Sequence, residues 1–162
     1  MILIGLGSSL KFCGAEPHEI IGLALGAIGE FAPVEANSRF FASPAWPDPS
    51  DPPFVNAVAI VRTKLEPAPL LAALHGVEAA FGRRRQVKNA PRTLDLDLLA
   101  YGRRIIAGEE GKPNLPHPGL HTRDFVLAPL CEIAPDWVDP RSGLTAADLL
   151  QALPARSATP ID

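Results

Sequence analysis

The chain has 162 residues, of which 47% are hydrophobic and 20% charged, and its formal net charge is −3 at pH 7. This length and apolar content suit one globular domain, expected over residues 1–153, with a disordered tail over residues 154–162. The acidic balance argues against a general nucleic-acid partner, and the absence of a long apolar run argues against a membrane partner. No signal-peptide pattern is present, and two isolated cysteines fit reduced thiols better than one disulfide, so a cytoplasmic protein is expected.

Strands and helices are expected to alternate along the first hundred residues. Period-two and continuous apolar runs predict strands over residues 1–6, 34–41, 54–63 and 93–101. Apolar residues at helical spacing predict helices that begin at Pro17 and Pro67. The proline-rich segment 43–53 between two of the strands is expected to be either a stiff loop or a mobile flap.

The order of these elements favours one fold class. Strand-helix-strand-strand-helix-strand is the split βαβ pattern of a ferredoxin-like α+β sandwich, whose sheet is antiparallel and carries both helices on one face. The other face is left for a ligand or for extra elements. The last third forms a loop-rich extension with one helix after Thr145, where Thr145 and Asp148 resemble a capping box.

Two aspartates stand on one face of the last expected strand. Strand alternation in Arg92-Thr93-Leu94-Asp95-Leu96-Asp97-Leu98 directs the leucines to one side and Asp95 and Asp97 to the other. The repulsion between two carboxylates favours a cation between them, and carboxylate oxygens are typical magnesium ligands. Two solvated aspartates are the alternative, but the leucines and the upstream Arg92 favour a metal site.

A cluster of positive charge precedes this strand. Residues 83–92 hold five basic side chains, and guanidinium groups bind phosphate oxygens in pairs. Next to the aspartates, the cluster suggests a polyphosphate with its magnesium, although for Arg84 and Lys88 a solvated loop is an equally good interpretation. Neither a Walker A motif nor the protein-kinase signatures are present, so side chains would hold the phosphates.

Asn56 lies between Phe54 and Val58 on an otherwise apolar strand face. A buried amide needs hydrogen-bond partners, and the neighbouring backbone is the ordinary source of them. Next to an aromatic ring, the amide can instead bind the polar edge of a flat heterocycle stacked on Phe54. Phe125 is either core or the second wall of such an aromatic clamp.

Three other side chains are weaker candidates. His75 and Glu78 share a face of the second helix and lie off its main apolar stripe, so solvated surface is their default interpretation. They gain interest because this helix leads into the basic cluster. His117 stands between two prolines, which suits a rigid phosphate contact, although a lone histidine is more often structural.

Several segments occur in an order that resembles one enzyme family. They are Phe54-Val55-Asn56-Ala57, Gly82-Arg83, Pro91-Arg92-Thr93-Leu94-Asp95-Leu96-Asp97, Leu115-Pro116-His117-Pro118 and Arg123-Asp124-Phe125-Val126-Leu127-Ala128-Pro129-Leu130. From the first strand to about Pro135 the chain resembles the 6-hydroxymethyl-7,8-dihydropterin pyrophosphokinases of folate biosynthesis. The resemblance implies a monomeric, magnesium-dependent enzyme that transfers the β,γ-pyrophosphoryl group of ATP to the pterin's hydroxymethyl oxygen and releases AMP.

The resemblance also implies residue roles. Asp95 and Asp97 would hold two Mg²⁺ ions, and Arg83 and Arg92 would be the catalytic arginines. The residues expected to contact ATP are His75, Glu78, Arg83, Arg85, Arg92, Lys112, His117 and Arg123. The residues expected to line the pterin pocket are Ser43, Pro44, Trp46, Phe54, Asn56 and Phe125.

The chain departs from the family pattern at three places. Asn89-Ala90 stands where Trp-Gly is common, Ser9 where an asparagine is common, and Gly119 where a basic residue is common. Ser9 is therefore given no role.

Two other functions could use the same residues. A ferredoxin-like RNA-binding module would need exposed aromatic residues on its central strands, and that pattern is missing. A metal-dependent nuclease or phosphatase would use the aspartate pair for hydrolysis instead of transfer.

Overall fold

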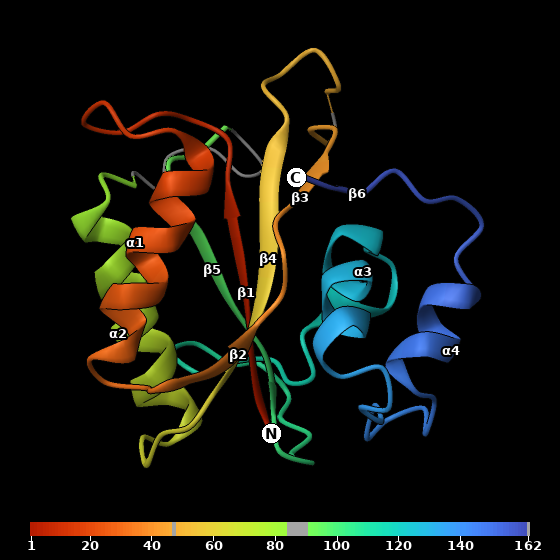
Figure 1. Cartoon of the computed structure of the whole chain (residues 1–162). Helices are drawn as coiled ribbons and strands as arrows, with labels where there is room; N and C mark the ends of the chain where they lie inside the picture. Colours follow the sequence, from red (N-terminus) through yellow and green to blue (C-terminus); the bar gives the residue numbers. More distant parts are fainter. Residues whose placement is uncertain (47, 84–90, 162) are drawn as a thin grey trace.

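A computed structural model describes residues 1–46, 48–83 and 91–161. The elements run in the order β1 (Ile2–Ser8), α1 (Pro17–Gly29), β2 (Val34–Asn37), β3 (Phe41–Ser43), β4 (Phe54–Val61), α2 (Pro67–Ala80), β5 (Asp95–Tyr101), the 3-10 helix η1 (Pro118–His121), α3 (Asp124–Ile133), α4 (Ala146–Gln151) and β6 (Thr159–Pro160) (Figure 1). Within the described residues, no helix has the length and apolar character of a membrane span.

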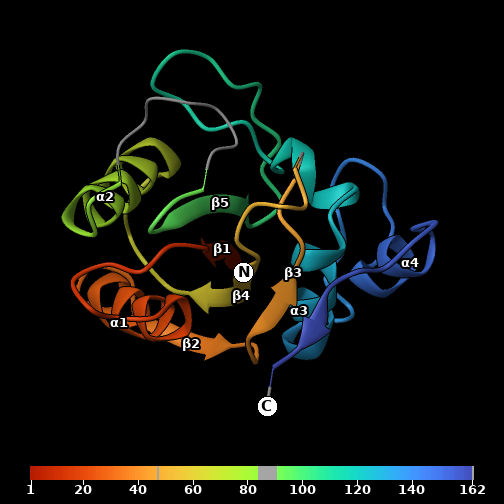
Figure 2. The ribbon, with the colours of Figure 1, turned by 90° about the horizontal axis from the view of Figure 1, so that it is seen from above.

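The strands form one antiparallel sheet. Its order is β5-β1-β4-β3-β6, and β2 pairs with β4 next to β3. The central pair β1 and β4 runs in register from Ile2 opposite Val61 to Ser8 opposite Val55. Seen from above, α1 and α2 lie together on one face of this sheet (Figure 2). The predicted ferredoxin-like α+β fold is therefore confirmed.

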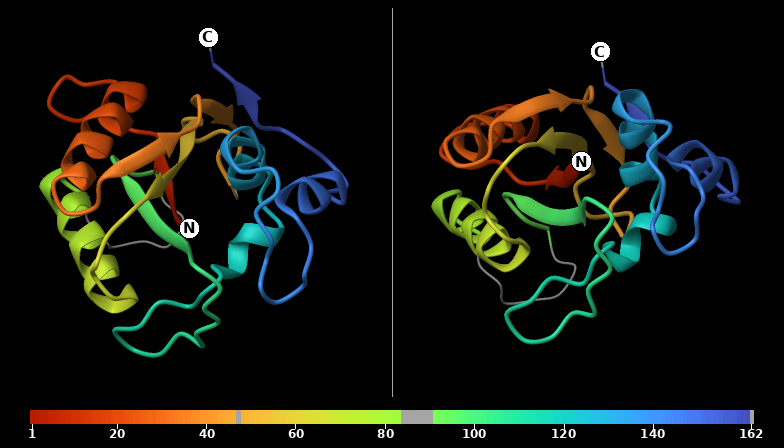
Figure 3. Two further views of the ribbon diagram at one scale, coloured as in Figure 1. Left: turned by 60° about the horizontal axis from the view of Figure 1, so that its bottom comes forward. Right: turned by 90° about the horizontal axis from the view of Figure 1, so that it is seen from below.

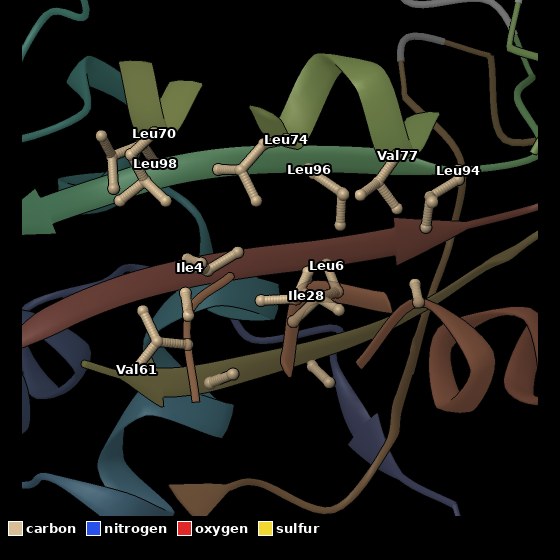
Figure 4. Packing of buried hydrophobic residues seen from close by; sticks show 14 of the residues in the cluster. Ile4, Leu6, Ile28, Val61, Leu70, Leu74, Val77, Leu94, Leu96 and Leu98 are labelled. Carbon is tan, nitrogen blue, oxygen red and sulfur yellow. The ribbon is translucent and has the colours of Figure 1, made fainter. Parts of the chain in front are cut away.

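Alternation along the strands divides the buried apolar residues into two cores. One core lies between the sheet and helices α1 and α2, where Leu74 of α2 packs over Leu96 and Leu98 of β5 (Figure 4). The other lies between the opposite face of the sheet and helices α3 and α4, and includes Leu99 and Leu127. Figure 3 shows these helix pairs on the two sides of the sheet. The face that was left for a ligand or for extra elements is thus partly covered by the C-terminal extension.

Helix starts follow the local sequence signals. Helices α1 and α2 begin at Pro17 and Pro67. Proline suits the first position of a helix because an N–H group there would have no partner within the helix, and proline has none. Helix α4 follows Thr145, whose Oγ1 accepts a hydrogen bond from Asp148 N at 3.1 Å while Thr145 N donates to the Asp148 carboxylate at 3.2 Å. The predicted capping box is therefore confirmed.

One strand was expected over residues 34–41, but β2 ends at Asn37 and a second short strand, β3, begins at Phe41. β2 and β3 both pair with β4, and the chain breaks between them at Ser38. The Ser38 hydroxyl accepts a hydrogen bond from Val58 N at 3.1 Å and donates to Arg39 O at 2.7 Å. A side-chain hydroxyl therefore replaces a backbone group of the ladder, which ends the strand.

The C-terminal segment also differs from expectation. Residues 154–162 were expected to be disordered, but β6 pairs with β3, and Ile161 N donates to Phe40 O at 2.8 Å. Ala158 N donates to the Asp124 carboxylate at 2.7 Å. The expectation is wrong for residues 157–161, because distant partners that the sequence does not reveal satisfy their backbone groups.

Leu74→Ala is expected to lower the free energy of unfolding by about 2–5 kcal/mol, because it leaves a cavity in the first core. Leu74 is fully buried at 0% exposure. Urea unfolding measures the change, with Leu23→Ala as the control, since Leu23 is 58% exposed on α1. A loss no larger than that of the control would contradict the assignment of Leu74 to the core.

Candidate active site

A cavity of about 1050 Å³ opens on the α3 side of the sheet, where the end of β1 lies between the starts of β4 and β5. Most of the residues singled out in the sequence line it. They are Ser43, Pro44, Trp46, Phe54, Asn56, Arg83, Arg92, Asp95, Asp97, His117, Arg123 and Phe125. The fold therefore gathers segments from both halves of the chain around one space.

Strand register explains how the polar residues meet. Gly7 of β1 lies opposite Asn56 of β4 on one side and opposite Asp95 of β5 on the other, and Gly5 lies opposite Asp97. A Cβ atom on Gly7 would lie 3.5 Å from Asn56 Oδ1 and 3.8 Å from Asp95 Cβ. The missing side chain keeps the cavity floor open between the amide and the carboxylates.

Asp95 is held by two arginines. Its Oδ1 lies 2.5 Å from Arg83 Nη1, and its Oδ2 lies 3.0 Å from Arg92 Nη1. Both carboxylate oxygens are thus paired with guanidinium groups, which places the two expected catalytic arginines directly beside the aspartate strand.

Glu78 lies beneath this cluster instead of in solvent. It is only 1% exposed, and its carboxylate accepts hydrogen bonds from Arg83 Nη1 and, at 2.7 Å, from Leu96 N. The solvated interpretation is wrong because Glu78 continues the i, i+4 row of Leu70 and Leu74 on the buried face of α2. Glu78 therefore anchors Arg83 to β5.

Asp97 is the less satisfied carboxylate of the pair. Among the described residues, His117 Nε2 lies 3.8 Å and Arg123 Nη1 3.9 Å from its oxygens, both beyond hydrogen-bond distance. Burial, together with the charge of Asp95, raises the pKa of Asp97 to about 7. A carboxylate so destabilised suits a cation ligand. The described residues contain no group of three His, Cys, Asp or Glu side chains placed to hold a metal, so phosphate and water oxygens would have to complete the coordination.

His117 is fixed as a neutral donor. Its Nδ1 accepts a hydrogen bond from Gly119 N at 3.0 Å, and burial together with Arg123 lowers its pKa. The proton is therefore on Nε2, which faces Asp97 and the cavity. A Cβ atom on Gly119 would lie 2.6 Å from Arg123 Cζ. The glycine at this departure from the family pattern thus leaves room for the Arg123 guanidinium.

The turn that carries His117 is tied to a buried aspartate. Asp139 is 0% exposed and pairs with His121 Nε2 at 2.9 Å, while Ser142 donates to it from N at 2.9 Å and from Oγ at 2.6 Å. Burial alone would raise the pKa of Asp139, but the hydrogen bonds from Ser142 and His121 outweigh it and hold the pKa below its ordinary value.

Asp139→Asn is expected to flatten the loss of stability in acid. An aspartate whose pKa is lowered on folding stabilises the protein fully above its unfolded pKa of about 4, and this contribution is lost as the pH falls through the folded value. Urea unfolding between pH 7 and pH 3 measures the difference, with Asp136→Asn as an exposed control. Equal pH slopes for wild type and D139N would contradict the role of Asp139.

Two serines that received no role in the sequence position Arg92. Arg92 N donates to Ser9 Oγ at 3.1 Å, and Ser9 N and Leu10 N donate back to Arg92 O at 3.0 and 3.2 Å. Ser8 Oγ donates to Thr93 O at 2.6 Å. The turn after β1 therefore fixes the backbone from which Arg92 reaches Asp95.

Another part of the cavity lining is aromatic. Phe54, Phe125 and the 70% exposed Trp46 line it, and Asn56 Nδ2 donates to Ser43 Oγ at 2.9 Å. The Arg123 guanidinium lies over the Phe125 ring, 5.8 Å from its centroid. A buried amide among aromatic rings suits a flat, polar-edged heterocycle.

Other expected residues lie outside the cavity lining. Lys112 lines a smaller neighbouring cavity of about 330 Å³ that shares Asp97 and His117 with the larger one. Neither His75 on α2 nor Glu78 is among the lining residues of the large cavity. Arg85 lies outside the described residues, as do Arg84, Lys88 and Asn89-Ala90.

A ferredoxin-like sheet that gathers two carboxylates, several arginines and an aromatic pocket in one cavity is typical of phosphate-transferring enzymes. A family model described as 7,8-dihydro-6-hydroxymethylpterin-pyrophosphokinase (HPPK) matches residues 3–135, and the chain belongs to this family.

Similar proteins agree with this assignment. Two curated relatives are called 2-amino-4-hydroxy-6-hydroxymethyldihydropteridine pyrophosphokinase. The one from Synechocystis is 43% identical over 98% of this chain and 79% of its own length, and the one from Haemophilus influenzae is 40% identical over 86% and 84%.

A solved structure supports the fold. The HPPK-DHPS of Plasmodium falciparum gives a TM-score of 0.71 at 12% identity, covering 93% of this chain. This chain spans 44% of that longer protein, and the likeness bears on the fold alone.

Proposed function

We propose that this chain transfers the pyrophosphoryl group of ATP to 6-hydroxymethyl-7,8-dihydropterin, giving AMP and the pterin pyrophosphate, a step of folate biosynthesis. The observation that carries the proposal is one cavity lined by two chemically different sets of residues, here called its charged end and its aromatic end. Asp95, Asp97 and their arginines form a charged end, and Phe54, Asn56 and Phe125 belong to an aromatic end. The family assignment points to the same reaction.

The two ends share enough room for two substrates. Ligand cavities commonly range from about 300 to 1000 Å³, and this one is about 1050 Å³. ATP would lie with its phosphates at the charged end and the pterin with its ring at the aromatic end. The hydroxymethyl oxygen would then approach the β-phosphorus in line with the bond to the leaving AMP.

Asp95 and Asp97 would hold magnesium, with two ions expected. The unsatisfied carboxylate of Asp97 supports this assignment. When bound, the ions neutralise the triphosphate and polarise the bond to the leaving AMP. Arg83 and Arg92, which pair with Asp95 in this structure, would turn to the phosphate oxygens and stabilise charge that develops in the transition state.

Other groups of the chain would position the substrates. His117 Nε2–H and the Arg123 guanidinium border the space beside Asp97 and can donate to phosphate oxygens. Asn56 can hydrogen-bond the polar edge of the pterin while the aromatic rings hold its faces. Such positioning supplies a large part of the acceleration in a reaction between two bound substrates.

Product analysis tests the proposal. Purified protein is incubated with ATP and the pterin alcohol, with and without Mg²⁺, and the nucleotides are separated. AMP that forms only when the pterin and Mg²⁺ are both present is the expected result. ADP, or AMP formed equally without the pterin, would contradict transfer and favour the hydrolase alternative.

We also propose that the enzyme acts as a monomer in the cytoplasm. The cavity is built from residues of one chain, and Cys13 and Cys131 are both free thiols. Light scattering at assay concentration should give a mass near 17.2 kDa. A dimer mass would contradict the monomer.

A further inference from the structure

We propose that Asp124 is a positioning residue that clamps the C-terminal strap, residues 155–161, against one wall of the cavity and thereby sets the geometry of the pterin pocket. This inference rests on the proposed function, because it takes the aromatic end of the cavity as the pterin site.

The Asp124 carboxylate gathers donors from the strap. Asp124 opens α3 and is only 8% exposed. Its Oδ2 accepts hydrogen bonds from Ser157 N, from Ser157 Oγ at 3.2 Å and from Ala158 N at 2.7 Å. Hydrogen bonds to a carboxylate are stronger than neutral ones, and this carboxylate is largely shielded from water. The strap is therefore fastened at one point to the first residue of α3.

The strap is fastened at a second point to the sheet. In β6, Thr159 lies opposite Ala42 and Pro160 opposite Phe41, and Ile161 N donates to Phe40 O at 2.8 Å. Figure 1 shows the strap leaving α4 and reaching β3 at the edge of the sheet. The strap thus joins the start of α3 to β3, whose other partner strand among the described residues is β4.

Both attachment points adjoin residues of the pterin pocket. Phe125 follows Asp124 directly, and Ser43, the last residue of β3, accepts the hydrogen bond from Asn56 Nδ2. Asp124 and Ser157 themselves line the cavity. Releasing the strap would let the Phe125 wall and the Ser43 wall move independently, which loosens the pocket.

Most of the charged end of the cavity is held by other elements, while Arg123 directly precedes Asp124. Arg83 is anchored by Glu78 of α2, and Arg92 by Ser9 after β1. Loss of the clamp should therefore weaken pterin binding more than ATP binding.

The test compares Asp124→Ala, a chain ending at Pro154, and the two changes combined. Each single change is expected to raise the KM for the pterin about tenfold, with a much smaller change in the KM for ATP. The KM of the combined variant for the pterin should be no higher than that of the shortened chain, because both changes remove the same restraint. Asp136→Ala, at an exposed aspartate after α3, is the matched control and should behave as wild type.

Hydrogen exchange of the strap amides provides the second readout. Asp124→Ala should speed exchange at Ser157 and Ala158, and Asp124→Asn, which keeps an acceptor oxygen, should restore part of the protection and of the pterin KM. If D124A fails to fold, the shortened chain and D124N carry the comparison.

An unchanged pterin KM in active variants, equal increases in both KM values, or additive effects in the combined variant would each overturn the clamp. A wild-type protein that forms no AMP would instead overturn the proposed function.

Discussion

Asp97→Ala is expected to lower the rate of AMP formation on the order of a thousandfold while leaving pterin binding close to that of wild type. In the described part of the chain, His117 Nε2 and Arg123 Nη1 lie 3.8 and 3.9 Å from the Asp97 carboxylate, beyond hydrogen-bond distance, so its oxygens are available to a metal ion. The aromatic end of the cavity comes from other elements, with Phe54 and Asn56 on β4 and Phe125 on α3, and should keep its shape. Steady-state AMP formation and pterin binding by fluorescence measure the two effects separately.

Asp97→Asn is the matched control, because it keeps the shape of the side chain and removes only its charge. It should lose nearly as much activity as Asp97→Ala and should respond weakly to added Mg²⁺. AMP formation within a few-fold of wild type by either variant would contradict the metal assignment.

Arg83→Ala is expected to lower both turnover and stability. Arg83 pairs with both the buried Glu78 and Asp95. The side chain of Arg83 is 13% exposed and that of Glu78 is 2% exposed. Removing one partner of such a pair costs about 3 kcal/mol, because a carboxylate stays buried with one charged partner fewer. The missing guanidinium would also no longer stabilise charge on the phosphates, so the rate falls on the order of a hundredfold or more.

A second change at Glu78 separates the two effects. In the double variant Glu78→Gln with Arg83→Ala, the neutral amide can still accept the hydrogen bond from Leu96 N. Urea unfolding should show recovered stability, while AMP formation should stay as low as in R83A. Recovery of turnover together with stability would mean that Arg83 acts only on the fold.

Local patterns in the sequence were sufficient for most elements of the first hundred residues and for the faces of β5. The alternation of Leu94, Leu96 and Leu98 with the two aspartates predicted that the aspartates share the opposite face of the strand. In the structure the leucines lie in the core and both aspartates line the cavity. Proline positions marked the starts of α1 and α2. Such signals are local because side-chain direction follows from the period of the helix or strand.

Long-range contacts could not be obtained in this way. Ser8 and Thr93 are 85 residues apart, and Asp124 and Ser157 are 33 apart, so no local period links them. Strand pairing decides which distant residues meet. For example, Gly7 of β1 pairs with both Asn56 of β4 and Asp95 of β5, and so brings these two residues to the same place. Glu78 is the one miss that spacing could have avoided, because it continues a buried row of α2.

The short strand β6 also bears on self-association. The edge of β3 that it covers would otherwise present unpaired backbone groups on which a second molecule could add a strand. With β6 in place, the sheet ends in two residues, one of them Pro160, which has no N–H to donate. The segment that restrains the pocket therefore also leaves a sheet edge to which the strand of a second molecule pairs poorly. Its loss would favour aggregation at high protein concentration.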